Sequence, residues 1–145
     1  MNVKEIVEST IIKILEESAY MLSDSIDEFP ILGDNFMSAE INFSNDKVGI
    51  IQLSAEKGLF VKMASNMLGC EETDDKAFDM KDDSLCEFLN ILAGNIITEL
   101  FGDDVVIDLS LPNFINSESI NIDDYSVWLN VEGFNMVVNM KVDSE

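Results

Sequence analysis

The stretch from Asp83 to Leu100 (DSLCEFLNILAGNIITEL) constrains the fold most, because its apolar residues recur with the period of a helix. At about 100° per residue, one side of this predicted helix carries apolar residues, namely Leu85, Phe88, Leu89, Leu92, Ile96 and Leu100. The opposite side carries what we call the polar stripe: Asp83, Glu87, Asn90, Gly94 and Thr98. We therefore predict a core helix over residues 83–100 with one polar face.

The polar stripe contains two residues that weaken a helix. In a helix interior, Asn costs about 0.6 kcal/mol and Gly about 1 kcal/mol relative to Ala. On a face that is only solvated, Lys, Gln or Ala would give a more stable helix than Asn90 and Gly94 do. The bare backbone of Gly94 also lets another surface approach closely. Glu87 and Asn90 are three residues apart, so their Cβ atoms lie about 5–6 Å apart and their side chains can act on one bound group. We interpret the stripe as a contact surface, although an acid and an amide also occur on ordinary wet helix faces.

Helical and strand patterns alternate along the N-terminal half of the chain. Apolar residues recur with a helical period from residue 3 to about residue 22, and residues 23–35 then have the composition of a loop. An alternation with a period of two predicts strands over residues 37–43 and 48–53. These two strands must be antiparallel, because only a turn at residues 44–46 connects them.

A second helix is predicted over residues 55–68. Ser54 is expected to be its N-cap, and Gly69 is well placed to end it. The charged segment 71–82 that follows is expected to be a solvated connection into the core helix. The side chains of the second helix that are predicted to face inward are Leu59, Met63, Ala64 and Met67.

The C-terminal third has the pattern of three strands. Apolar residues alternate over residues 105–111, Pro112 ends this strand, and a polar loop over residues 113–124 follows. The tail is predicted to be a hairpin with strands over residues 125–131 and 134–142. We expect this terminal hairpin to leave an edge that can pair with a second chain.

The order of these elements predicts an α+β fold, in which two to three helices pack on an antiparallel sheet. A chain of 145 residues with 47% hydrophobic content is long enough for one core. We therefore expect a single domain over residues 1–145.

Charge and composition exclude several classes of function. With 29 acidic and 8 basic residues, the formal charge of −21 repels nucleic acid and anionic membranes. The chain has no histidine, so it lacks the usual Ser-His and Cys-His nucleophile pairs. Its two cysteines have no CxxC spacing, and no segment matches a DxDxDG calcium loop.

No signal-peptide pattern and no apolar run of about 20 residues is present, so we expect a cytoplasmic protein. A catalytic carboxylate pair drawn from distant segments stays open.

The sequence resembles the chemotaxis phosphatases of the CheC, CheX and FliY group. Residues 83–90, DSLCEFLN, match the group's [DS]xxxExxN signature, and the continuation ILAGN is similar to its NxxxGN run. LSLP at residues 109–112 resembles the strand and proline that follow this helix in CheX-like members, whereas NFINSE at residues 113–118 departs from their Gly-ended turn. The resemblance is strongest over residues 36–142. Because the first helix has no second ExxN, the pattern is closest to single-site CheX-like domains.

This resemblance implies an enzyme that hydrolyses the aspartyl phosphate of a CheY-type response regulator. In that family the glutamate pairs with a lysine of the regulator, and the asparagine orients a water for in-line attack on phosphorus. Glu87 is then the docking acid, Asn90 is the water-positioning residue, and Gly94 is a partner contact. Asp83 is implied as a partner contact too, but N-capping of the helix by Asp82 or Asp83 explains it equally well.

The resemblance also has implications for cofactors and partners. The phosphorylated regulator brings its own Mg²⁺ and lysine, so no cofactor of the chain itself is implied. A homodimer is implied by the likeness to CheX-like domains. The alternative function is an adaptor or pseudo-phosphatase that binds a response regulator through the same helix without hydrolysis.

Overall fold

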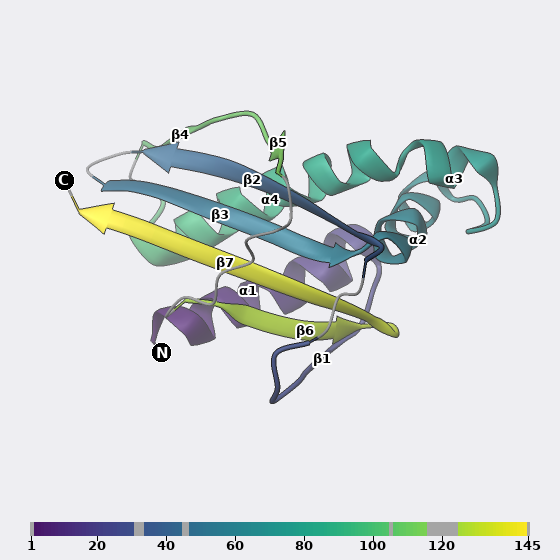
Figure 1. Ribbon diagram of the computed structural model, residues 1–145. Coiled ribbons are helices and arrows are strands. Elements are labelled where there is room, and N and C mark those ends of the chain that lie inside the picture. Colours follow the sequence, from purple (N-terminus) through teal and green to yellow (C-terminus); the bar gives the residue numbers. More distant parts are fainter. Residues whose placement is uncertain (1, 31–33, 45–46, 105, 116–124, 145) are drawn as a thin grey trace.

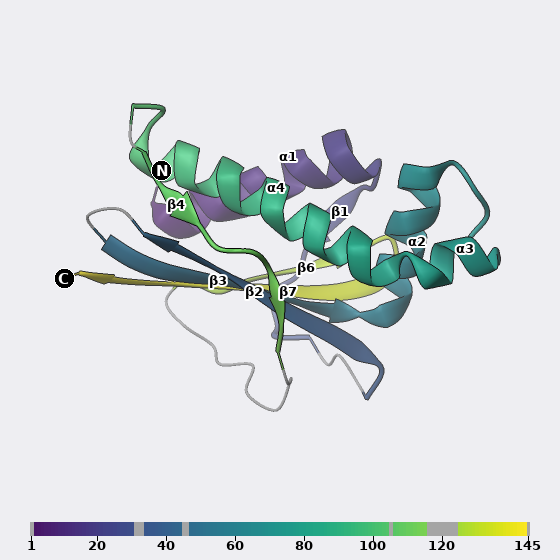
Figure 2. The same cartoon turned by 90° about the horizontal axis from the view of Figure 1, so that it is seen from above.

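Helices cover one face of an antiparallel sheet in the computed structural model, which describes residues 2–30, 34–44, 47–104, 106–115 and 125–144. Helices α1 and α4 lie side by side on this face, and α2 and α3 pack at the end of the sheet where α4 begins (Figures 1 and 2). The α+β class is thereby confirmed. The elements in chain order are α1 (Val3–Ala19), β1 (Ser23–Ser25), β2 (Phe36–Ser44), β3 (Lys47–Glu56), α2 (Lys57–Leu68), α3 (Asp75–Asp79), α4 (Lys81–Phe101), β4 (Asp108–Leu109), β5 (Asn113–Phe114), β6 (Val127–Val131) and β7 (Phe134–Ser144).

The strand order places the terminal hairpin inside the sheet. The seven-stranded sheet has the order β1-β6-β7-β3-β2-β4, with β5 also pairing with β2. Strand β7 lies between β6 and β3, and residues Ser23–Ser25 of β1 pair antiparallel with β6. The expectation that the hairpin provides a free edge is therefore wrong. The outer strands are β1 on one side and the short β4 and β5 on the other.

The apolar face of α4 forms part of the core between the helices and the sheet. Its buried side chains are Ser84, Leu85, Phe88, Leu89, Leu92, Ala93, Ile96 and Ile97. Within the described ranges, α4 is also the one helix that is long and apolar enough to span a membrane by length and composition. Burial of this face in the core accounts for its hydropathy, because core helices of folded domains pass the same test.

Several predicted helix ends shift by a few residues. Helix α1 ends at Ala19, because Tyr20 adopts a left-handed conformation with φ of 58°. The N-cap of α4 is Met80, which makes no side-chain capping bond, so the prediction that Asp82 or Asp83 caps this helix is wrong. Both acids lie instead in its first turn, where negative charge favours the helix dipole. The predicted connection before α4 contains the short helix α3.

Strand β3 continues further than predicted. It runs to Glu56, so Ser54 is a buried strand residue and not a helix cap, and α2 begins at Lys57. The Ser54 hydroxyl lies 2.7 Å from that of its cross-strand partner Ser38, and this hydrogen bond satisfies both buried groups. The predicted end of α2 at Gly69 is confirmed, with φ of 73°. Residues 45–46 of the predicted turn lie outside the described residues.

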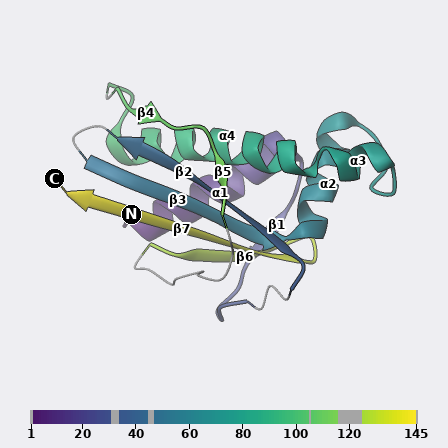
Figure 3. The same cartoon turned by 45° about the horizontal axis from the view of Figure 1, so that its top comes forward.

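The apolar alternation after α4 does not form one strand. Only Asp108–Leu109 and Asn113–Phe114 pair with β2, and Leu109 and Leu111 from the predicted inward row are exposed. This segment follows the outer edge of the sheet beside α4 (Figure 3). An alternating pattern buries one row of side chains only where the whole strand lies on a core, and here it does not. Val105 and most of the predicted loop, residues 116–124, lie outside the described residues.

A close contact between β2 and β3 gives a prediction about stability. Gly49 pairs with Phe43, and a Cβ added to Gly49 would lie 2.1 Å from the Phe43 ring. This ring is buried and packs against Phe101, with 6.2 Å between the ring centroids, so it has little room to shift. We expect Gly49→Ala to lower the free energy of unfolding by about 1–3 kcal/mol, measured by urea denaturation. Gly94→Ala is the control and should not lower the free energy of unfolding, because no atom beyond its own stretch of helix backbone lies within 4 Å of the added Cβ and Ala favours the helix over Gly. Equal stability of Gly49→Ala and the wild type would contradict this account.

Candidate functional site

The polar stripe lies on the exposed side of α4, as its period predicts. Asp83, Glu87, Asn90 and Thr98 are exposed and Gly94 is half-buried, whereas the opposite side of the helix lies in the core. The helical rise of about 1.5 Å per residue spaces these residues along roughly 22 Å of one helix. One continuous element therefore positions all of the predicted site residues.

The side chains of Glu87 and Asn90 are free to bind a partner. Neither makes a hydrogen bond or ion pair with any residue that the structure describes. Asn95 differs, because its side-chain amide donates to the Ile91 carbonyl oxygen at 2.8 Å. The Asn90 amide can donate to one group while its oxygen accepts from a water, and the Glu87 carboxylate can accept from a cation.

Gly94 leaves an open surface further along the stripe. It lines a shallow cavity of about 190 Å³ together with Ile97, Thr98, Gly102, Asp103, Ile107 and Leu109. A Cβ at Gly94 would have no neighbour within 4 Å, so the surrounding chain does not require glycine there. The absence of a side chain keeps this part of α4 accessible to another surface.

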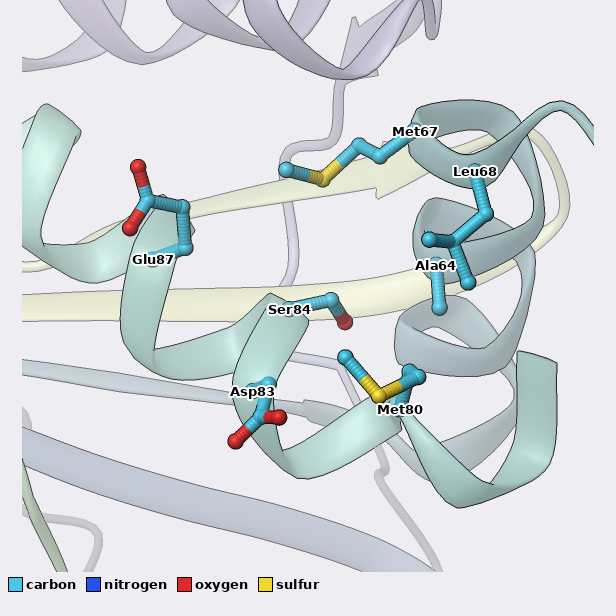
Figure 4. Close-up of a pocket in the computed structure, with 7 residues that line it drawn as sticks. All are labelled: Ala64, Met67, Leu68, Met80, Asp83, Ser84 and Glu87. Atoms are coloured by element: carbon cyan, nitrogen blue, oxygen red, sulfur yellow. The ribbon is translucent and has the colours of Figure 1, made fainter. Parts of the chain in front are cut away.

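A second hollow, which we call the α2–α4 hollow, lies where the end of α2 faces the start of α4. Its volume is about 240 Å³, and its apolar wall consists of Ala64, Met67, Leu68 and Met80. Asp83, Ser84 and Glu87 from α4 form the rest of its lining, opposite the α2 side chains (Figure 4). The structure thus brings Asp83 and Glu87 together at one hollow, whereas Asn90 and Gly94 lie further along α4.

Sequence reasoning missed the α2 side of this hollow. Leu59, Met63 and Ala64 are buried as predicted, but the prediction that Met67 faces inward is wrong, since it is 38% exposed. Leu68 beside it is 45% exposed. The period correctly aligns Met67 with Met63, but in the last turn of α2 this side chain lines the hollow toward α4 and not the core. No local signal in the sequence marks Met67 and Leu68 as exposed, because adjacent apolar residues such as Phe88 and Leu89 are both buried in α4.

Three contacts hold the walls of the α2–α4 hollow in place. The Ser84 hydroxyl donates to the Phe60 carbonyl oxygen at 3.0 Å and so joins α4 to α2. Lys62 on α2 forms an ion pair of 2.8 Å with Glu132 in the β6–β7 turn, and Glu132 also accepts from the Leu22 amide at 2.8 Å. The hydrogen bond between Lys62 and Glu132 lowers the pKa of Glu132 and raises the pKa of Lys62. Both hollow-forming helices are therefore fixed to the core.

The start of α4 carries negative charge that nearby lysines leave largely unpaired. Lys81 lies over the Phe78 ring, 3.9 Å from its centroid, and donates to the Phe78 carbonyl oxygen at 3.3 Å. Its ammonium group is also 3.9 Å from Asp82, while Asp83 and Glu87 have no ion pair within the described part of the chain. Burial, and then the charges of Asp83 and Asp82, raise the pKa of the Cys86 thiol. A cation is the complementary group for this surface.

The comparisons with known proteins agree with this fold. The family model described as "Chemotaxis phosphatase CheX" matches residues 37–131. A crystal structure of a chemotaxis protein CheX from Desulfovibrio desulfuricans superimposes with a TM-score of 0.74 at 14% identity, covering 99% of this chain and 100% of that one. CheX from Vibrio vulnificus gives a TM-score of 0.70 at 14% identity, covering 99% and 97%.

A third similar structure is the CheX–CheY–BeF3–Mg²⁺ complex from Borrelia burgdorferi. Its TM-score is 0.69 at 22% identity, and the match covers 97% of both chains. At such identities these structures show a shared fold. No curated protein matches the sequence.

Proposed function

This chain belongs to the chemotaxis phosphatase CheX family, and from that membership we propose that it hydrolyses the aspartyl phosphate of a CheY-type response regulator. The observation that carries the proposal is the position of Asn90 and Glu87, whose unengaged side chains are neighbours on the exposed side of a core helix. The structure of the Borrelia burgdorferi relative, described as a complex with CheY, BeF3 and Mg²⁺, supports the choice of partner.

In the proposed reaction, Asn90 orients a water and Glu87 pairs with a lysine of the regulator. The water oxygen attacks phosphorus in line with the bond to the aspartyl oxygen, that bond breaks, and inorganic phosphate and the free aspartate result. Such a transfer needs positioning and charge neutralisation, so a chain without histidine can catalyse it. The Mg²⁺ belongs to the phosphorylated regulator, and the chain supplies no metal of its own.

Other parts of the proposal concern the contact surface and the assembly. Asp83 and Gly94 contact the regulator on either side of the Glu87–Asn90 pair, and Asp83 does not cap α4 but lies exposed in its first turn. The likeness to CheX-like domains leads us to include a homodimer that acts in the cytoplasm. The competing function is an adaptor that binds the regulator through the same stripe without hydrolysis.

The direct test is the fate of a phosphorylated regulator. Each CheY-type regulator of the source organism is phosphorylated with acetyl phosphate, freed of excess reagent and mixed with the protein. We expect at least one to lose its phosphate about tenfold faster or more, measured as phosphate release over time. Unchanged lifetimes for every regulator that binds would favour the adaptor. Unchanged lifetimes with no binding would contradict both functions.

A further inference from the structure

We propose that the α2–α4 hollow is an anchor site for an aliphatic side chain of the response regulator, next to the lysine that pairs with Glu87. This inference rests on the proposed function and extends it from a pair of polar contacts to a binding site of mixed character. The occupant is one segment of the regulator that presents an aliphatic residue beside its lysine.

The lining of the hollow defines the aliphatic part of the occupant. Its wall is made of Ala64, Met67, Leu68 and Met80, and Met67 and Leu68 remain substantially exposed. Exposed apolar side chains grouped in a hollow gain free energy when a partner removes them from water. The volume of about 240 Å³ is below the roughly 300–1,000 Å³ that is usual for small-molecule sites. The hollow therefore fits a single inserted side chain better than a separate ligand.

The charge at the rim defines the cationic neighbour of that side chain. Asp83 and Glu87 are four residues apart on α4 and both line the hollow, with their carboxylate groups at its outer edge and directed away from the apolar wall (Figure 4). Lys81, the nearest lysine in sequence, is directed to the Phe78 ring and carbonyl group. A regulator segment with a lysine next to an aliphatic residue complements the apolar wall and the acidic rim together.

Continuity with the proposed catalytic pair favours the regulator as the occupant. Glu87 belongs both to the hollow and to the polar stripe, and Asn90 follows it by three residues. A regulator that engages Glu87 and Asn90 therefore covers the mouth of the hollow. Its affinity then depends on α2 as well as on α4.

The test uses two substitutions in the hollow and one matched control. Met67→Asp places a charge on the apolar wall, and Ala64→Leu fills the space. Val48→Asp is the control, because Val48 is 38% exposed, as is Met67, and lies on β3 near the β2–β3 connection. For the regulator that the wild type dephosphorylates, we expect each hollow variant to raise KM and the Kd for the BeF3-activated regulator about tenfold or more, with kcat retained. Val48→Asp should leave KM and Kd unchanged.

The outcomes separate this inference from the proposed function. Wild-type KM and Kd in both hollow variants, or a fall in kcat alone, would overturn the anchor site while leaving the phosphatase intact. A wild-type protein that dephosphorylates no regulator would instead overturn the proposed function, and with it the premise of the anchor site. Circular dichroism checks folding, and if Ala64→Leu does not fold, Leu68→Ser replaces it with the same expected change in KM.

Discussion

Replacement of Asn90 by alanine is expected to lower kcat for regulator dephosphorylation by about 100-fold or more, while the Kd for the BeF3-activated regulator changes less than about threefold. The amide makes no hydrogen bond within the described structure, so its loss should not disturb α4. Without it, the attacking water has no fixed position relative to phosphorus. Single-turnover phosphate release gives kcat, and titration of the activated regulator gives Kd.

Thr98→Ala is the control for Asn90→Ala, because Thr98 is exposed on the same stripe two turns further along. This variant should keep wild-type kcat. If Asn90→Ala weakened binding and hydrolysis to the same extent, Asn90 would be a docking residue and the water-positioning role would be wrong. If neither parameter changed, Asn90 would lie outside the site.

The second large effect is expected for Glu87→Lys, which should raise the Kd for the activated regulator about 100-fold. Replacing an attractive carboxylate by an ammonium group opposite the regulator's lysine removes an ion pair and adds a like-charge repulsion. The wild-type affinity should also fall as ionic strength rises, because salt screens exposed charges. Binding titrations at low and high salt measure both effects.

Glu99→Lys makes the same charge change on α4 at an exposed position off the polar stripe. It should alter Kd only slightly, and this comparison separates a specific contact at Glu87 from the attraction between the acidic protein as a whole and its partner. Comparable losses of affinity in Glu87→Lys and Glu99→Lys would contradict a specific lysine contact.

The sequence predicted α4 and its polar stripe well because both follow from local periodicity. The alternation between core and solvent repeats over the whole helix, so an error of two residues at its start leaves every side chain on the correct face. The strands β2, β3, β6 and β7 were also found from their alternation. Their order in the sheet was not, because pairing with a distant segment leaves no mark in the strand's own sequence.

The parts that the sequence could not predict depend on contacts between distant segments. Ser23–Ser25 is polar and short, and it is a strand only because the β6 edge lies beside it. Serine is a common helix N-cap, but the pairing of β3 with β2 and β7 extends the strand past Ser54. The α2–α4 hollow likewise needs two helices to meet, so no single segment shows it. The spacing of Glu87 and Asn90 on one helix predicted that they are neighbours. The apolar wall of the hollow beside them could not be predicted, because it comes largely from a different helix.

The burial of one side of α4 has a consequence for the energetics of complex formation. Fixing the backbone of a residue costs about 1–2 kcal/mol in conformational entropy, and a loop bearing the same residues would lose that freedom when a partner arrives. In α4 the folding of the core has already ordered the backbone from Asp83 to Thr98. Binding then needs to restrict only side-chain rotamers, so a small contact area supports recognition. A small contact area also permits rapid dissociation, which suits the proposed phosphatase because it has to release each regulator after one turnover.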